Sequence, residues 1–222
     1  MPVIVSEKGI KSKIKLGERV AVVENIKYPY FESEKHKKLC GRMNDFYSSV
    51  AEKYSFHARN RLPKRIKLAR VTCKLPMVLA MNYTVALCNE DVVSVVLDLV
   101  FSQGKNMKMR RFSQLWSVKK CDMLAISDVL KKGSAGKLYS YVLTSAKKNG
   151  ESGTFGYFDD YPLKLGKSFD IKNCFAVPKG LCFFVNAGIL SPVKYGASNF
   201  ILPFESIKDL IKDDFLPSFD KK

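Results

Sequence analysis

Apolar side chains recur at helical spacing in two parts of the chain. In the first part the residues on one face are Leu39, Met43, Phe46, Tyr47, Val50 and Tyr54. Burying such a stripe stabilises a fold by roughly 1.5–3 kcal/mol per large side chain before entropy is counted. Ser33 precedes the stripe, and its hydroxyl can accept from a first-turn amide. We therefore predict a helix from Ser33 to about Phe56, and a second one over Ser134 to Lys148 with Gly150 as its stop.

Between these helices the apolar positions alternate as they do in strands. Lys13 to Tyr30 has enough alternation for one or two strands. Four more runs, separated by Pro76, Asn89-Glu90 and Gln103-Gly104, predict strands over 65–75, 77–88, 91–101 and 107–116. Short connections favour antiparallel pairing. The pattern predicts an α+β fold, a curved antiparallel sheet with helices packed on one side.

Residues 168–213 form one supersecondary pattern of hairpin, loop, strand and helix. Phe169 and Ile171 alternate with polar neighbours as a strand does, and Val177-Pro178-Lys179-Gly180 has the residues of a tight turn. A second strand from Leu181 to Val185 is followed by a loop rich in Gly and Pro. Phe200 to Pro203 then predicts a third strand, and a short helix runs from Phe204 to about Lys212.

This segment resembles the closing part of the RsiV-like domain of unknown function. That family's pattern is an aromatic strand, a Pro/Gly turn, a strand ending in Asn, a loop into a Pro, and an Ile-Pro-aromatic entry to the last helix. The corresponding residues here are Phe169, Pro178, Gly180, Asn186, Pro192 and Leu202-Pro203-Phe204. Looser matches are Tyr28-Pro29-Tyr30, Met43-Asn44, and Cys121-Asp122 through Ser127-Asp128-Val129-Leu130. The resemblance covers roughly Val20 to Ile211.

The RsiV-like family includes the outer domain of bacterial lysozyme-sensing anti-sigma factors and a module of some peptidoglycan deacetylases. The resemblance therefore implies a non-catalytic domain for binding or sensing. The family's aromatic-acidic pair after the strand-ending Asn is replaced here by Ala187-Gly188. A strongly basic chain is also a poor partner for animal lysozymes, which are themselves basic.

Composition fits one folded domain over residues 1–222, with residues 1–15 as an N-terminal extension. The longest apolar run, Val92 to Phe101, contains Asp98 and is far below spanning length, and residues 1–5 are too short for a signal peptide. These features predict a cytoplasmic protein without a membrane segment. Six cysteines without a Cys-x-x-Cys pair are then expected as reduced, buried thiols, with three disulfides as the alternative.

The net charge of +17 is confined to two segments. Residues 1–75 hold 18 Lys and Arg against 7 Asp and Glu, and residues 105–120 hold 6 basic residues and no acidic one. On a strand, Lys108 and Arg110 share one face while Arg111 lies on the other. The segment is either an anion-binding stripe or a solvated strand whose lysines guard an edge. The candidate contacts are Lys108, Arg110 and Arg111, with Lys64, Arg65 and Lys67 if the strands bring them together.

Residues for catalysis are sparse. The two histidines, His36 and His57, lie near the ends of the first predicted helix, and His36 with Cys40 makes only two metal ligands of the four that a site needs. Asp159-Asp160 would point apart if extended, so a turn or helix-entry role is expected. None of the common nucleotide-binding, hydrolase or metalloprotease motifs is present. We expect no enzyme, cofactor or metal.

The sequence thus predicts an intracellular binding domain for an acidic protein or another anionic partner. Non-specific binding of nucleic acid is the alternative, because charge alone attracts phosphate. None of the helix-turn-helix, zinc-finger or RNP signatures supports sequence-specific readout.

Overall fold

The computed structural model describes residues 3–68 and 76–215, apart from the side chains of Arg65 and Leu68. The chain divides into two compact units. Unit 1 comprises Met1–Thr84 and Leu97–Arg110, and unit 2 comprises Val85–Val96 and Arg111–Lys222. The divisions between the units fall inside three long strands, so each unit contains one half of those strands. Each unit is described by itself below.

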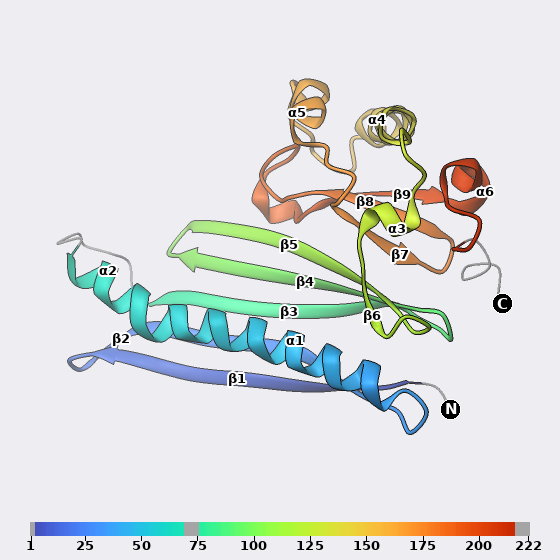
Figure 1. Ribbon diagram of the computed structural model, residues 1–222. Coiled ribbons are helices and arrows are strands. Elements are labelled where there is room, and N and C mark those ends of the chain that lie inside the picture. Colours follow the sequence, from blue (N-terminus) through green and yellow to red (C-terminus); the bar gives the residue numbers. More distant parts are fainter. Residues whose placement is uncertain (1–2, 69–75, 216–222) are drawn as a thin grey trace. The chain divides into compact units, whose positions relative to one another are not determined.

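The secondary structure confirms the α+β class (Figure 1). One sheet has the order β1-β2-β3-β4-β5-β6, and its strands are β1 Ile4–Leu16, β2 Arg19–Glu32, β3 Met77–Cys88, β4 Val92–Gln103, β5 Asn106–Ser117 and β6 Asp122–Leu124. A second sheet has the order β7-β8-β9, with β7 Cys174–Val177, β8 Gly180–Val185 and β9 Ser198–Pro203. The strands predicted over 77–88, 91–101 and 107–116 correspond to β3, β4 and β5. No helix within the described ranges is long and apolar enough to cross a lipid bilayer.

Unit 1 begins with a long antiparallel hairpin. Residues 4–16, expected as part of an extension, form β1, which pairs with β2 along its whole length from Ile4 opposite Glu32 to Leu16 opposite Arg19. Ile10 and Ile14 of β1 lie opposite the buried Ile26 and Val22 of β2. The hairpin therefore has one apolar face to bury.

Helix α1, Lys37–Phe56, packs on β2 and buries that face (Figure 1). Leu39, Met43 and Tyr47 of the predicted stripe are fully buried. Ser33 Oγ accepts a hydrogen bond from the amide of His36 at 3.3 Å, so it caps the turn before the helix. The helix itself begins four residues after Ser33.

The β2–β3 pair is parallel, with Val22 opposite Met77 and Ile26 opposite Met81. The sequence predicted antiparallel pairing from short connections, but these two strands are joined by the whole helical segment. A long helical crossover returns the chain to the same end of the sheet, and this makes neighbouring strands parallel. Unit 1 is therefore built around a strand–helix–strand crossover.

The strand predicted over 65–75 is wrong in its first part. Residues 57–61 form a π-helix, η1 His57–Arg61, and α2 Leu62–Leu68 continues from it. Pro63 lacks an N–H, and the wider π-turn before it accommodates the proline within the continuing helix. The chain therefore continues as a helix after α1 instead of forming a strand. The rest of the predicted strand, residues 69–75, lies outside the described residues.

Unit 2 packs helices α4 Ala135–Glu151 and α5 Tyr161–Ser168 with the second sheet (Figure 1). Leu138 and Val142 of α4 and Leu165 of α5 are fully buried in one apolar core with Phe183 and Phe200 of the sheet. Three short helical elements, α3 Ile126–Val129, η2 Val193–Tyr195 and α6 Phe204–Ile207, and the 3-10 turn η3 Lys208–Leu210 complete the unit. The predicted helix over 134–148 is confirmed, and it continues past Gly150.

The hairpin predicted around Pro178 is present, with Val177 paired to Gly180. Its first strand is misplaced, however, because β7 starts at Cys174. Phe169 instead ends α5, its amide donating to the carbonyl of Leu165 at 2.8 Å, and a turn follows. The alternation of Phe169 and Ile171 comes from a helix end and a turn, both of which place apolar side chains against the core.

Candidate binding site

Unit 1 contains an apolar groove of about 320 Å³ where the end of α1 and η1 face strands β3 and β4. Its apolar lining comes from Tyr54 and Phe56 of the helix, Leu79 of β3, and Leu99 and Phe101 of β4. Leu79 is buried, whereas Phe56 is 58% exposed. Such a large exposed aromatic beside a concave apolar surface is typical of a binding site rather than of a solvated helix face.

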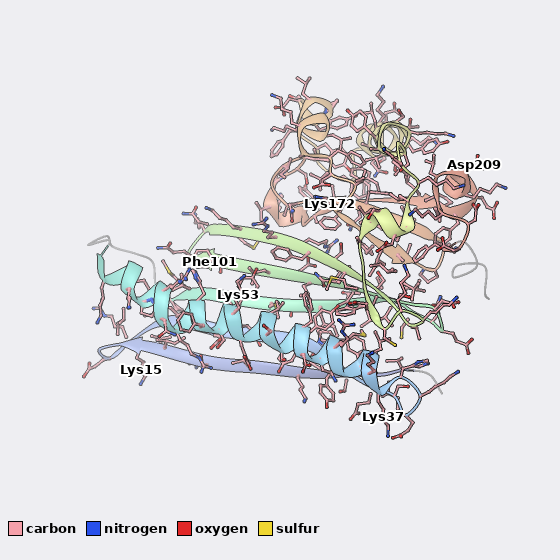
Figure 2. All side chains as sticks on the ribbon, viewed as in Figure 1. Lys15, Lys37, Lys53, Phe101, Lys172 and Asp209 are labelled. Carbon is pink, nitrogen blue, oxygen red and sulfur yellow. The ribbon has the colours of Figure 1, made fainter. Side chains whose placement is uncertain are left out.

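The remaining groove residues are Lys53, His57 and Arg61, and none of the described residues that line the groove is acidic. Lys53 and Arg61 are exposed and His57 is half-buried. Figure 2 labels Lys53 on α1 and Phe101 on β4, two of the elements that form this groove. The site is thus an apolar surface with a positively charged margin.

The π-helix positions the cationic part of this margin. The amide of Leu62 donates to the carbonyl of His57, five residues earlier, which is the hydrogen bond of a π-turn. The next residue, Pro63, lacks an N–H and would clash with the carbonyl four residues before it in a regular helix. The wider turn accommodates Pro63, and Asn60 Nδ2 donates to the carbonyl of Phe56 at 3.1 Å. Such π-bulges are frequent at functional sites.

A buried ion pair fixes the π-helix to the hairpin. Arg59 Nε donates to Glu24 Oε2 at 3.2 Å, and the side chain of Glu24 is fully buried while that of Arg59 is half exposed. Ser12 Oγ donates to the same oxygen at 2.5 Å. Arg59 lies between His57 and Arg61 in sequence, so its anchoring to Glu24 constrains the turn that carries both groove residues.

Electrostatics link the groove to the basic segment of β5. Burial raises the pKa of the Tyr54 hydroxyl, and the charge of Arg110 opposes that shift. The phenol therefore stays protonated at neutral pH and can donate a hydrogen bond to an anion. Arg110, a predicted contact residue, acts on a residue that lines the groove.

The structure separates the three predicted contacts on β5. Lys108 and Arg110 are exposed and belong to unit 1, as the alternation predicted. Arg111 belongs to unit 2, where its amide donates to Asn186 Oδ1 at 2.6 Å and its guanidinium donates to Asn199 Oδ1 at 2.7 Å. These bonds give Arg111 a role in connecting β5 to the β8 and β9 segments.

The second predicted group lies on a helix and not on a strand. Lys64 and Lys67 are exposed, three residues apart on α2, so they share a helical face. The backbone of Arg65 belongs to the same helix. Sequence analysis missed Lys53, His57 and Arg61, although the Arg-rich segment directly before Pro63 was a signal for a helix irregularity.

The acidic and cysteine residues considered for chemistry have the following environments in the structure. Asp160 is the N-cap residue of α5 and pairs with Lys164 at 2.8 Å, which agrees with the predicted helix-entry role. Within the described ranges no three His, Cys, Asp or Glu side chains are grouped as metal ligands. Of the cysteines in those ranges, Cys40, Cys174 and Cys182 are buried thiols, whereas Cys88 is exposed and Cys121 is half-buried.

Comparison with known proteins identifies the fold. No family model matches the sequence, and no curated protein matches it. A member of the DUF3298 family from Bacteroides fragilis aligns over 98% of this chain and 96% of its own with a TM-score of 0.74 and 12% identity. A DUF3298 family protein from Pseudomonas aeruginosa PAO1 aligns over 96% of both chains with a TM-score of 0.65 and 13% identity. The chain has the fold of these DUF3298 proteins. At this identity the likeness concerns the fold alone.

Several residues on which the sequence resemblance was based bond to the backbone of neighbouring elements. Asn44 on α1 bonds both backbone groups of Phe31 in β2, accepting from its N–H at 2.8 Å and donating to its carbonyl at 2.9 Å. Asp128 accepts from the amide of Ala125 at 2.9 Å. Asn186 accepts from the amide of Arg111. None of these residues lines the groove of unit 1.

Proposed function

We propose that this protein is a non-catalytic binding domain that recognises an acidic protein through unit 1. The observation that carries this proposal is the partition of charge between the units. Unit 1 holds 21 Lys and Arg against 8 Asp and Glu, a net +13, whereas unit 2 holds 17 against 13, a net +4. A surface with this excess attracts anionic partners and increases their association rate.

Two further features support a protein as the partner. The groove combines an apolar lining with Lys53, His57 and Arg61, and interface anchors are typically aromatic or aliphatic side chains surrounded by polar contacts. The sequence pattern also resembles the RsiV-like domain, which includes the outer domain of lysozyme-sensing anti-sigma factors. The same positive charge disfavours a basic partner such as an animal lysozyme.

A binding titration tests the proposal with fluorescent poly-L-glutamate as the probe. We expect the wild-type chain to bind it at low salt and the Lys108→Glu/Arg110→Glu variant to bind at least tenfold more weakly. Arg111 is left unchanged because of its bonds to Asn186 and Asn199. The matched control reverses Lys147 and Lys148, which are exposed on α4 of unit 2. Equal weakening by both double variants would contradict a binding function of unit 1.

Nucleic acid is the second candidate. Lys11, Lys13 and Lys15 are exposed at alternate positions of β1, and such a row of charges can follow a phosphate backbone. Titration with single-stranded and duplex DNA separates the two proposals. Binding of DNA that is tighter than that of poly-L-glutamate at equal salt, and that is lost on Lys11→Glu/Lys13→Glu substitution, would favour nucleic acid.

A further inference from the structure

The groove of unit 1 has an apolar lining, which non-specific attraction between charges does not require. Its lining contains five apolar or aromatic side chains, Tyr54, Phe56, Leu79, Leu99 and Phe101. Phe56 remains 58% exposed although the apolar face of α1 is otherwise packed on the sheet. Covering this surface would remove apolar area from water at about 25 cal/mol per Å².

The size of the groove restricts its occupant. A volume of about 320 Å³ is at the small end of ligand pockets, which span roughly 300–1,000 Å³. It accommodates one bulky side chain. Small-molecule sites usually enclose most of their ligand, whereas here the exposed Phe56 and the exposed Lys53 and Arg61 stand at the margin. These features are typical of an interface pocket for an anchoring side chain.

The positive charges at the margin of the groove favour acidic residues beside the anchoring side chain in the partner's sequence. Lys53 and Arg61 line the groove together with His57, and the described part of the chain contributes no carboxylate to its lining. Arg110 acts electrostatically on Tyr54, so a further positive charge lies near the groove. Acidic side chains flanking the anchor would meet these groups and gain charge-assisted hydrogen bonds.

We infer that the groove receives one aromatic side chain of an acidic protein segment, while the segment's carboxylates pair with Lys53 and Arg61. This inference rests on the proposed function and adds the specificity of the interaction. The π-helix carries His57 and Arg61 and holds them in position at the groove. It is bound to the hairpin by the ion pair between Arg59 and Glu24. Charge supplies attraction, and the groove selects among acidic partners.

Three synthetic peptides separate the contribution of charge pairing from that of the aromatic side chain in the groove. The first is acetyl-Glu-Glu-Trp-Glu-Glu-amide, the second has Ala in place of Trp, and the third has Gln in place of each Glu. Binding is followed by the methyl resonances of Leu79 and Leu99 in ¹³C-methyl-labelled protein. We expect the first peptide to bind at least tenfold more tightly than either of the others and to shift both methyl groups.

Two variants locate the effect in the groove. Leu99→Trp places a large side chain in the space that the Trp side chain of the peptide needs, so this variant should bind the Trp and Ala peptides with equal affinity. Phe56→Ser changes an exposed residue, so it preserves the fold even if Leu99→Trp does not. It should lower the ratio of the two affinities at least threefold. Binding of the Ala peptide should be unchanged in both.

The outcomes distinguish this inference from the proposed function. Equal affinities of the Trp and Ala peptides without methyl shifts would contradict binding of an aromatic side chain in the groove. Such a result would still agree with recognition of an acidic protein by unit 1. Absence of binding by both acidic peptides would overturn the two together. If acetyl-tryptophan alone shifts the methyl groups as strongly as the peptide does, the groove is a small-molecule site and the inference is wrong.

Discussion

The two units differ in where they place charge and where they place apolar surface. Unit 1 has a net charge of +13 in 98 residues and leaves an apolar groove and Phe56 open at its surface. Unit 2 has a net charge of +4 in 124 residues and buries Leu138, Phe183 and Phe200 in an apolar core, while Leu163 and Ile201 are exposed at its surface. A charge excess costs self-repulsion, and the acidic partner proposed above would offset that cost on binding.

The same contrast appears in the polar contacts. In unit 2 the residues of the RsiV-like pattern, such as Asp128 and Asn186, bond backbone groups. In unit 1 the buried Glu24 holds an arginine on the π-helix that carries part of the groove. Both units are packed around buried apolar side chains, and unit 1 in addition has an ion pair whose carboxylate is fully buried. Substitutions can test this contrast.

The largest effect is expected at Gly180, where β8 approaches β9 too closely for a side chain. A Cβ at this position would lie 2.0 Å from the carbonyl oxygen of Leu202, a backbone atom that cannot move independently. We expect Gly180→Ala to lower the free energy of unfolding by roughly 3 kcal/mol or more. Fluorescence of Trp116, the single tryptophan and a buried residue of unit 2, reports the unfolding in denaturant.

Gly136→Ala is the matched control. Gly136 lies in helix α4 of the same unit, and nothing lies within 4 Å of the position that its Cβ would take. Alanine should stabilise the helix by about 0.5–1 kcal/mol. If both alanines change stability by a similar amount, the close packing assigned to β8 and β9 is incorrect.

The next effect concerns the buried pair of unit 1. Arg59→Ala leaves the Glu24 carboxylate buried without its cation, which costs about 3–5 kcal/mol for a fully buried pair. Because the Arg59 side chain is half exposed, we expect about 2 kcal/mol, measured by circular dichroism in denaturant. Glu24→Gln removes the charge together with the need to neutralise it, so it should cost less than Arg59→Ala. An Arg59→Ala variant as stable as wild type would show that charge pairing does not hold the π-helix.

The prediction from sequence succeeded where one element buries one periodic face. Helix α1 and strand β3 have side chains whose burial follows their own period, so neighbouring residues sufficed to predict them. The strand predicted over 65–75 failed because alternation in Arg65-Ile66-Lys67-Leu68 also fits a short helix. The helix forms here because the π-turn before Pro63 continues the path of α1.

The groove could not be predicted from local sequence. It joins residues near 53–61 with Leu79 and Phe101, and their meeting depends on the parallel pairing of β2 with β3. Composition did indicate the unit that contains it, because most of the charge excess lies in residues 1–75. The individual contact residues remain predictions, and Arg111 also bonds Asn199 of unit 2.

An effect of similar size should appear in unit 2, but only at alkaline pH. Burial raises the pKa of the Cys174 and Cys182 thiols to about 12, from an ordinary value of 9.0. Their stabilising contribution is therefore complete below pH 9 and is lost as the pH rises from 9 towards 12, because only the unfolded chain ionises easily there. At pH 10 each thiol should favour unfolding by about 1.4 kcal/mol.

This pH dependence is measured as a difference between proteins. The free energies of unfolding of wild type and of Cys174→Ala/Cys182→Ala are compared at pH 8 and pH 10 under reducing conditions. Wild type should lose about 2–3 kcal/mol more than the variant between the two pH values. Equal losses would mean that the thiols are not enclosed as the unit 2 core requires.

The smallest effect is expected at an exposed ion pair of unit 2. Lys164 pairs with Asp160 at 2.8 Å on the first turn of α5, and its Nζ lies 4.2 Å from the centre of the Phe158 ring. Both charged side chains are partly exposed, at 38% and 54%. Lys164→Ala should therefore cost only about 0.3–1 kcal/mol at low salt, and less at 1 M salt, where charges are screened within about 3 Å. The buried Glu24–Arg59 pair of unit 1 should keep most of its contribution under the same salt, because water and ions reach it less. A Lys164→Ala effect as large and as resistant to salt as that of Arg59→Ala would contradict the expected difference between an exposed ion pair and one whose carboxylate is buried.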